Sequence, residues 1–132
     1  GIKTINIGAT SPIVTEGLTQ FKLSLGAKPE DIKFFQHHYI WLVPLKNSLV
    51  LRNILKSNPF ISILEDNLFL SFFIEPSEHE SKEEFIKFIK PGNWKNIKAI
   101  KIYCFNNSEK IAEWIREENY QNVQVLEYDH KL

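Results

Sequence analysis

Residues 97–128 read IKAIKIYCFNNSEKIAEWIREENYQNVQVLEY, and this stretch decides the fold class. The apolar run from Ile97 to Phe105 is typical of a strand, and so is the run from Val123 to Tyr128. Between them, Ser108 begins a helical pattern that ends near Asn119 and is expected to bury Ile111, Ala112, Trp114 and Ile115. A strand, a helix and a strand in this order predict a right-handed parallel crossover, and thus a C-terminal βαβ unit over about residues 97–128.

A hairpin is predicted farther upstream, over about residues 60–74. Phe60 to Leu64 and Leu68 to Ile74 are apolar runs of strand length, and Glu65-Asp66-Asn67 between them supplies turn residues. Because a hairpin is antiparallel and the C-terminal crossover is parallel, we expect one mixed sheet.

Two helices are predicted from their start signals. Ser81 and Glu84 have the spacing of a capping box ahead of a helically periodic run, which is expected to bury Phe85, Ile86, Phe88 and Ile89. Asn47 or Ser48 is expected to cap a shorter helix that runs to Lys56, with Leu51, Ile54 and Leu55 directed inward.

The N-terminal half is harder to interpret. Residues 3–8 (KTINIG) and 39–43 (YIWLV) are each predicted to form a strand. Leu18 to Leu25 alternates like a strand and also repeats like a helix, so both assignments stay open. Pro29, followed by two acidic residues, predicts the start of a helix that runs to about His37.

These elements predict a single α/β (mixed α+β) domain over residues 1–132. A chain of 132 residues is of common single-domain size, and 43% apolar residues are enough to fill one core. We expect helices packed on a mixed sheet of five or six strands.

Composition narrows the classes of function. Sixteen basic and sixteen acidic residues cancel, and only Arg52 and Arg116 are arginines, which argues against a nucleic-acid partner. No apolar run is long enough for a membrane span, and no signal-peptide pattern opens the chain. The lone cysteine, Cys104, favours a reducing compartment, so we expect a cytoplasmic protein. Nothing in the composition predicts an oligomeric state.

The most unusual surface feature is the segment EPSEHESKEE at residues 75–84, called the acidic loop below. It holds five carboxylates, of which Glu75, Glu78, Glu80 and Glu83 are the candidate contacts for a partner protein with a basic surface. Acidic residues near a helix start also suit the helix dipole, so an ordinary solvated surface explains them as well. Trp94 follows on a predicted loop and is either an interface anchor or a packed loop residue.

A second candidate site lies after the strand that contains Cys104. A thiol in front of a helix N-terminus can be an activated nucleophile, with Asn106, Asn107 and Ser108 as ligand-binding groups and His130 as its base. The loop lacks glycine, and cysteine in an apolar strand is usually a small buried hydrophobe, which we favour. No histidine spacing suits a metal, and no cofactor motif is present, so neither is expected.

Three functions follow, in order of preference. The first is a small cytosolic, non-catalytic protein-binding module, such as an inhibitor, an immunity-type protein or an adaptor, acting through the acidic loop and Trp94. The second is an α/β enzyme or small-ligand-sensing domain with its site after Cys104. The third, a nucleic-acid-associated domain that uses a lysine stripe over residues 82–101, is the least favoured.

Overall fold

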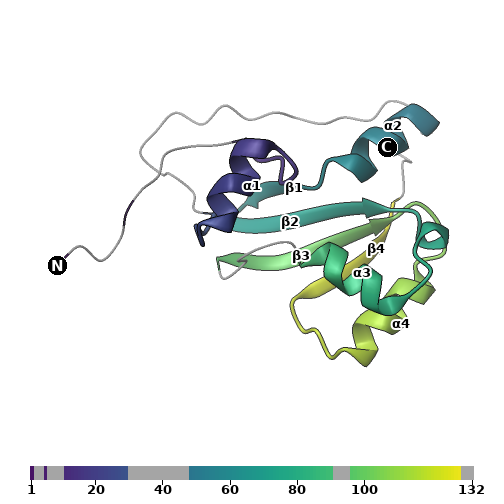
Figure 1. The fold of residues 1–132 in the computed structure, drawn as a ribbon. Coiled ribbons are helices and arrows are strands. Elements are labelled where there is room, and N and C mark those ends of the chain that lie inside the picture. Colours follow the sequence, from purple (N-terminus) through teal and green to yellow (C-terminus); the bar gives the residue numbers. More distant parts are fainter. Residues whose placement is uncertain (2–4, 6–10, 30–47, 91–95, 129–132) are drawn as a thin grey trace.

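The computed structural model describes residues 1, 5, 11–29, 48–90 and 96–128, and within them four strands form one sheet. Across the sheet the order is β1 (Phe60–Leu64), β2 (Asn67–Ile74), β3 (Ile97–Cys104) and β4 (Val123–Glu127). β1 is antiparallel to β2, whereas β2 and β3, and β3 and β4, are parallel pairs. The predicted mixed sheet, the hairpin and the C-terminal βαβ unit are therefore confirmed (Figure 1).

The β1–β2 hairpin closes on a two-residue turn. Leu64 pairs with Asn67, so Glu65 and Asp66 form the turn between them. Both turn residues have positive φ, 49° and 60°, as in the type I′ turn whose twist suits a hairpin. The Asn67 side-chain amide donates to the Glu65 carbonyl at 2.8 Å and holds the turn in place.

Helices cover both faces of the sheet. α3 (Lys82–Ile89) connects β2 to β3, and α4 (Glu109–Glu117) connects β3 to β4. Figure 1 shows these two helices on one side of the strands, with α2 (Leu49–Ser57) on the other. Because α2 packs against β2 from the opposite side, β2 is buried on both faces, which explains why its sequence is apolar from Leu68 to Ile74 except at Ser71.

The core has two parts that lie on opposite faces of β2. In the larger part, even-numbered β2 residues such as Phe72 pack with Phe85 and Ile89 of α3. Ile111 and Ile115 of α4 belong to the same part. The smaller part is aromatic and is centred on the other face of the strand, where it comprises Leu55, Phe73 and Phe105, with Leu51, Phe60, Tyr103 and Tyr128 packed around them. One strand thus carries side chains into both parts.

The ambiguous segment in the N-terminal half is a helix, α1 (Gly17–Ser24). Gly26 follows it with φ of +81°, a left-handed conformation that commonly ends helices. The Ile13 backbone bridges Phe60, so the segment before α1 lies beside β1. No helix among the described residues is long and apolar enough to cross a membrane.

The predicted count of five or six strands is not reached among the described residues, which hold four. The strands predicted at 3–8 and 39–43, and the helix expected from Pro29 to His37, fall wholly or largely outside the described residues.

Three side-chain predictions are corrected. Ile54 was expected to face inward but is 54% exposed, because α2 directs Leu51, Arg52, Leu55 and Lys56 toward the protein. Phe88 is also largely exposed, at 39%, whereas its α3 neighbours Phe85 and Ile89 are fully buried. Ser108 precedes α4 as predicted, but its hydroxyl makes no capping bond to the helix and lies 3.3 Å from Glu127 Oε1 instead.

Candidate functional site

The acidic loop begins where β2 ends. Glu75 follows the last β2 residue, Pro76–Glu78 form a short 3-10 turn (η1), and Ser81 caps α3. The Ser81 hydroxyl accepts a hydrogen bond from the Glu84 N–H at 3.2 Å, as the capping-box spacing predicts. The loop therefore lies at the carboxyl ends of the parallel strands, the edge where α/β sheets commonly place their binding groups.

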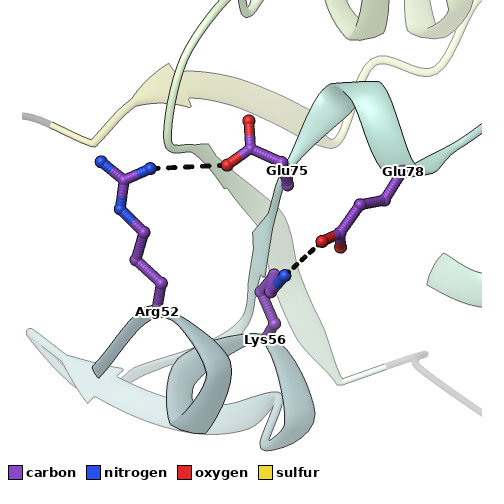
Figure 2. Close-up of polar contacts among 4 residues, drawn as sticks. All are labelled: Arg52, Lys56, Glu75 and Glu78. Atoms are coloured by element: carbon purple, nitrogen blue, oxygen red, sulfur yellow. Dashed lines mark hydrogen bonds and ion pairs between the residues drawn. The ribbon is translucent and has the colours of Figure 1, made fainter. Parts of the chain in front are cut away.

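Two of the loop carboxylates are bound to α2. Arg52 Nη1 lies 3.5 Å from Glu75 Oε2, and Lys56 Nζ lies 2.5 Å from Glu78 Oε1 (Figure 2). Arg52 and Lys56 are four residues apart and share one face of the helix, so both reach the loop. Glu75 and Glu78 thus fix the loop to the protein instead of presenting two unpaired charges to solvent.

The Arg52–Glu75 pair is the more buried of the two. The Glu75 side chain is 16% exposed and that of Arg52 is 28% exposed. The guanidinium also lies over the Phe105 ring, 5.1 Å from its centroid, so it connects the loop to the aromatic part of the core. The second carboxylate oxygen, Glu75 Oε1, is buried and has no hydrogen-bond partner among the described residues.

The other loop carboxylates remain exposed. Glu80, Glu83 and Glu84 face solvent and form no ion pair with another described residue. The lysine among them, Lys82, is directed toward α4, where Nζ lies 3.0 Å from Glu117 Oε2 and 3.1 Å from Glu118 Oε1. These hydrogen bonds raise the pKa of Lys82 and keep its charge on α4. Among the described residues, no cation consequently pairs with the three exposed carboxylates of the loop.

Lys110 of α4 binds the backbone of the acidic loop. Lys110 Nζ donates to the carbonyl of His79 at 2.6 Å and to that of Pro76 at 3.3 Å. The same ammonium group lies 4.8 Å from the centroid of the Trp114 ring. The backbone of η1 is therefore held by a charge-assisted contact with the next helix.

At the second candidate site, the surroundings of Cys104 differ from those that a reactive thiol requires. Cys104 is fully buried, and burial, followed by the nearby Glu127 and Glu75 carboxylates, raises its pKa to about 12. Asn106 and Asn107 lie exposed in the turn after β3, and Asn107 has a positive φ of 38°. The structure places the two asparagines beside the strand end but gives the thiol no route to solvent.

Iodoacetamide is expected to leave Cys104 unmodified in the folded protein. With a pKa near 12, only about one thiol in ten thousand is ionised at pH 8, and the sulfur is covered. Mass spectrometry after alkylation, with and without urea, measures this directly. Alkylation of the folded protein at the rate of a free cysteine would contradict the buried assignment.

Two residues named from the sequence, Trp94 and His130, lie outside the described residues. Their roles as interface anchor and as base for Cys104 stay predictions. Sequence reasoning missed Arg52 and Lys56 as partners of the acidic loop. Their spacing of four residues on a capped helix was the available signal, but nothing in the sequence showed that this helix packs beside residue 75.

The comparisons with known proteins add no family. No protein-family model, curated protein or solved structure matches this chain. Among the described residues, no group of three or more histidine, cysteine or acidic side chains is arranged to hold a metal ion. The acidic loop and its surroundings are therefore the candidate functional site of this chain.

Proposed function

We propose that this chain is a small, non-catalytic, cytoplasmic protein-binding module of the inhibitor, immunity-type or adaptor kind. Its acidic loop docks on a basic surface of another protein. One observation carries the proposal: Glu80, Glu83 and Glu84 are exposed and form no ion pair with another described residue, while the lysine between them is held on α4. An unbalanced set of carboxylates of this kind attracts a partner of opposite charge.

The loop carboxylates have two different tasks in this proposal. Glu80 and Glu83 contact the partner because they are exposed. Glu75 and Glu78 position the loop through Arg52 and Lys56 and contribute less to the contact itself. A loop that is already fixed loses less conformational entropy on binding than a free one, which favours tight association. Trp94, which follows the acidic loop in the sequence, is the proposed apolar anchor.

Reversing the exposed charges is the test of the proposal. We expect the double substitution Glu80→Lys and Glu83→Lys to weaken the complex about tenfold or more, because each reversal replaces an attraction with a repulsion. The partner is first isolated with the wild-type chain from lysate of the source cells. Its affinity for each purified variant is then measured by isothermal titration calorimetry at low and high salt.

A matched control uses two exposed carboxylates outside the acidic loop. Glu16 and Glu65 are also exposed, and Glu65 lies in the β1–β2 turn, far along β2 from Glu75. The substitutions Glu16→Lys and Glu65→Lys change the net charge by the same amount and should leave affinity within about twofold. If both double variants bind alike, the acidic loop is not the docking site.

The alternative function, an enzyme or ligand-sensing domain with its site after Cys104, gains no support from this geometry. The thiol is covered, its pKa is raised, and the Ser108 hydroxyl lies near Glu127 rather than the sulfur. A nucleophilic cysteine requires the opposite shift of the pKa together with access for a substrate.

A further inference from the structure

His79 lies at the centre of the acidic loop and is held there by aromatic packing. Its ring centroid is 5.1 Å from that of Phe85 and 5.5 Å from that of Phe88, both on α3. Phe85 is fully buried, so the imidazole covers the edge of the main core. Neither ring nitrogen forms a hydrogen bond with another described residue. Packing, rather than hydrogen bonding of the ring, therefore holds His79 in place.

Charged groups of both signs surround this ring. Glu78 of η1 and Glu84 of α3 favour the protonated imidazole, whereas Lys110 of α4 and Lys56 of α2 oppose it. The two acids and the two lysines act on the ring in opposite directions, so the burial of the ring decides the balance. Burial lowers the pKa of His79 below its ordinary value of 6.5, because an imidazolium loses hydration in this niche.

We propose that His79 is a proton-sensitive latch that holds the acidic loop against α3 when its ring is neutral and releases the loop when the ring is protonated. An imidazolium packed against Phe85 and Phe88 is partly shielded from water, and its ring makes no hydrogen bond with another described residue in the closed loop. It gains hydration when the ring swings into solvent. The Lys110 ammonium, which is bonded to the His79 carbonyl, adds a like charge close to the protonated ring.

The direction of the pH effect follows from proton linkage. The closed loop binds the proton less tightly than an open loop, whose histidine has a pKa near 6.5. The closed form is therefore fully favoured above that pH and loses stability as the pH falls from 6.5 through the lower pKa of the closed form. If the loop docks on a partner as proposed above, acidification also weakens docking; the latch itself does not depend on that proposal.

The test is an NMR titration of the whole chain, without a partner, from about pH 8 to about pH 5. We expect the His79 imidazole signals to titrate below pH 6.5. Amide signals of residues 77–81 should shift with the same midpoint, and their exchange protection should fall about threefold or more at the acid end. The matched variant is His79→Phe, which keeps an aromatic ring on Phe85 but cannot take up a proton. Its loop amides should stay unshifted and protected over the same range.

Three results would overturn the latch. They are a His79 midpoint at or above 6.5, loop amides that do not follow His79, or an unchanged loop titration in His79→Phe. The wild-type titration decides the first two even if the variant folds poorly. Because no partner takes part, these outcomes are separate from the charge-reversal result, and either proposal can fail without the other.

Discussion

The substitution Phe85→Ala is expected to lower the free energy of unfolding by about 3–5 kcal/mol. The Phe85 ring is fully buried where α3 meets the sheet, and its centroid lies 5.8 Å from that of Trp114 on α4. Truncation removes apolar contact area. It also leaves a cavity, because α3 and α4 are each fixed by their own packing against the sheet. Urea unfolding, followed by circular dichroism, measures the change.

Phe88 provides the control for this prediction. It lies on the same helix and contacts Phe72 at 5.3 Å between centroids, but it is 39% exposed. Phe88→Ala should therefore cost about 1–2 kcal/mol, because less area returns to water and the site opens to solvent. Equal losses for the two variants would mean that α3 does not direct Phe85 into the core as described.

The second large effect is expected at Arg52. Removing its side chain with Arg52→Ala should cost about 2 kcal/mol, because the nearly buried Glu75 carboxylate loses its cation and Phe105 loses the guanidinium above its ring. The matched variant is Lys56→Ala, four residues along the same helix. Its partner Glu78 is 54% exposed, so water replaces the lost pair and the cost should stay below about 1 kcal/mol.

A double-mutant cycle isolates the contribution of the Arg52–Glu75 pair. The change Glu75→Gln removes the charge that Arg52 neutralises and should reduce the cost of Arg52→Ala, as measured by the same urea unfolding. An Arg52→Ala cost that is no larger than that of Lys56→Ala, or that Glu75→Gln leaves unchanged, would show that burial of Glu75 does not strengthen the pair.

The C-terminal half of the fold was predictable because its signals are local. The capping residue Ser81, the turn at Glu65-Asp66 and the apolar run of β3 each act within a few residues of the chain. The same periodicity could not decide residues 18–25, because Phe21 and Leu25 fit both the strand pattern and the helix pattern. Both side chains are exposed, Phe21 on α1 and Leu25 at its C-terminal end. The sequence also predicts that Ile54 faces inward, because it belongs to an apolar helix face. Periodicity identifies such a face, but the neighbouring elements decide which side of the helix is covered.

The candidate site was predictable as a set of charges but not as an arrangement. The five carboxylates are visible in the sequence, yet nothing local shows that Glu75 and Glu78 are paired with α2, or that Lys82 is directed to α4. Those contacts join segments that are far apart in the chain. The burial of Cys104 followed from its apolar neighbours, whereas the approach of Glu127, from the adjacent strand, follows from the register of β3 and β4.

The order of the four described strands across the sheet is also their order along the chain. During synthesis on the ribosome, both strands of the β1–β2 hairpin leave the ribosome before β3, and β3 leaves it before β4. Each new strand therefore finds its neighbour already made, and none has to insert between two earlier ones. In the partly synthesised sheet, the most recently added strand exposes the edge to which the next strand will pair. This edge is where a nascent chain of this kind needs protection from aggregation.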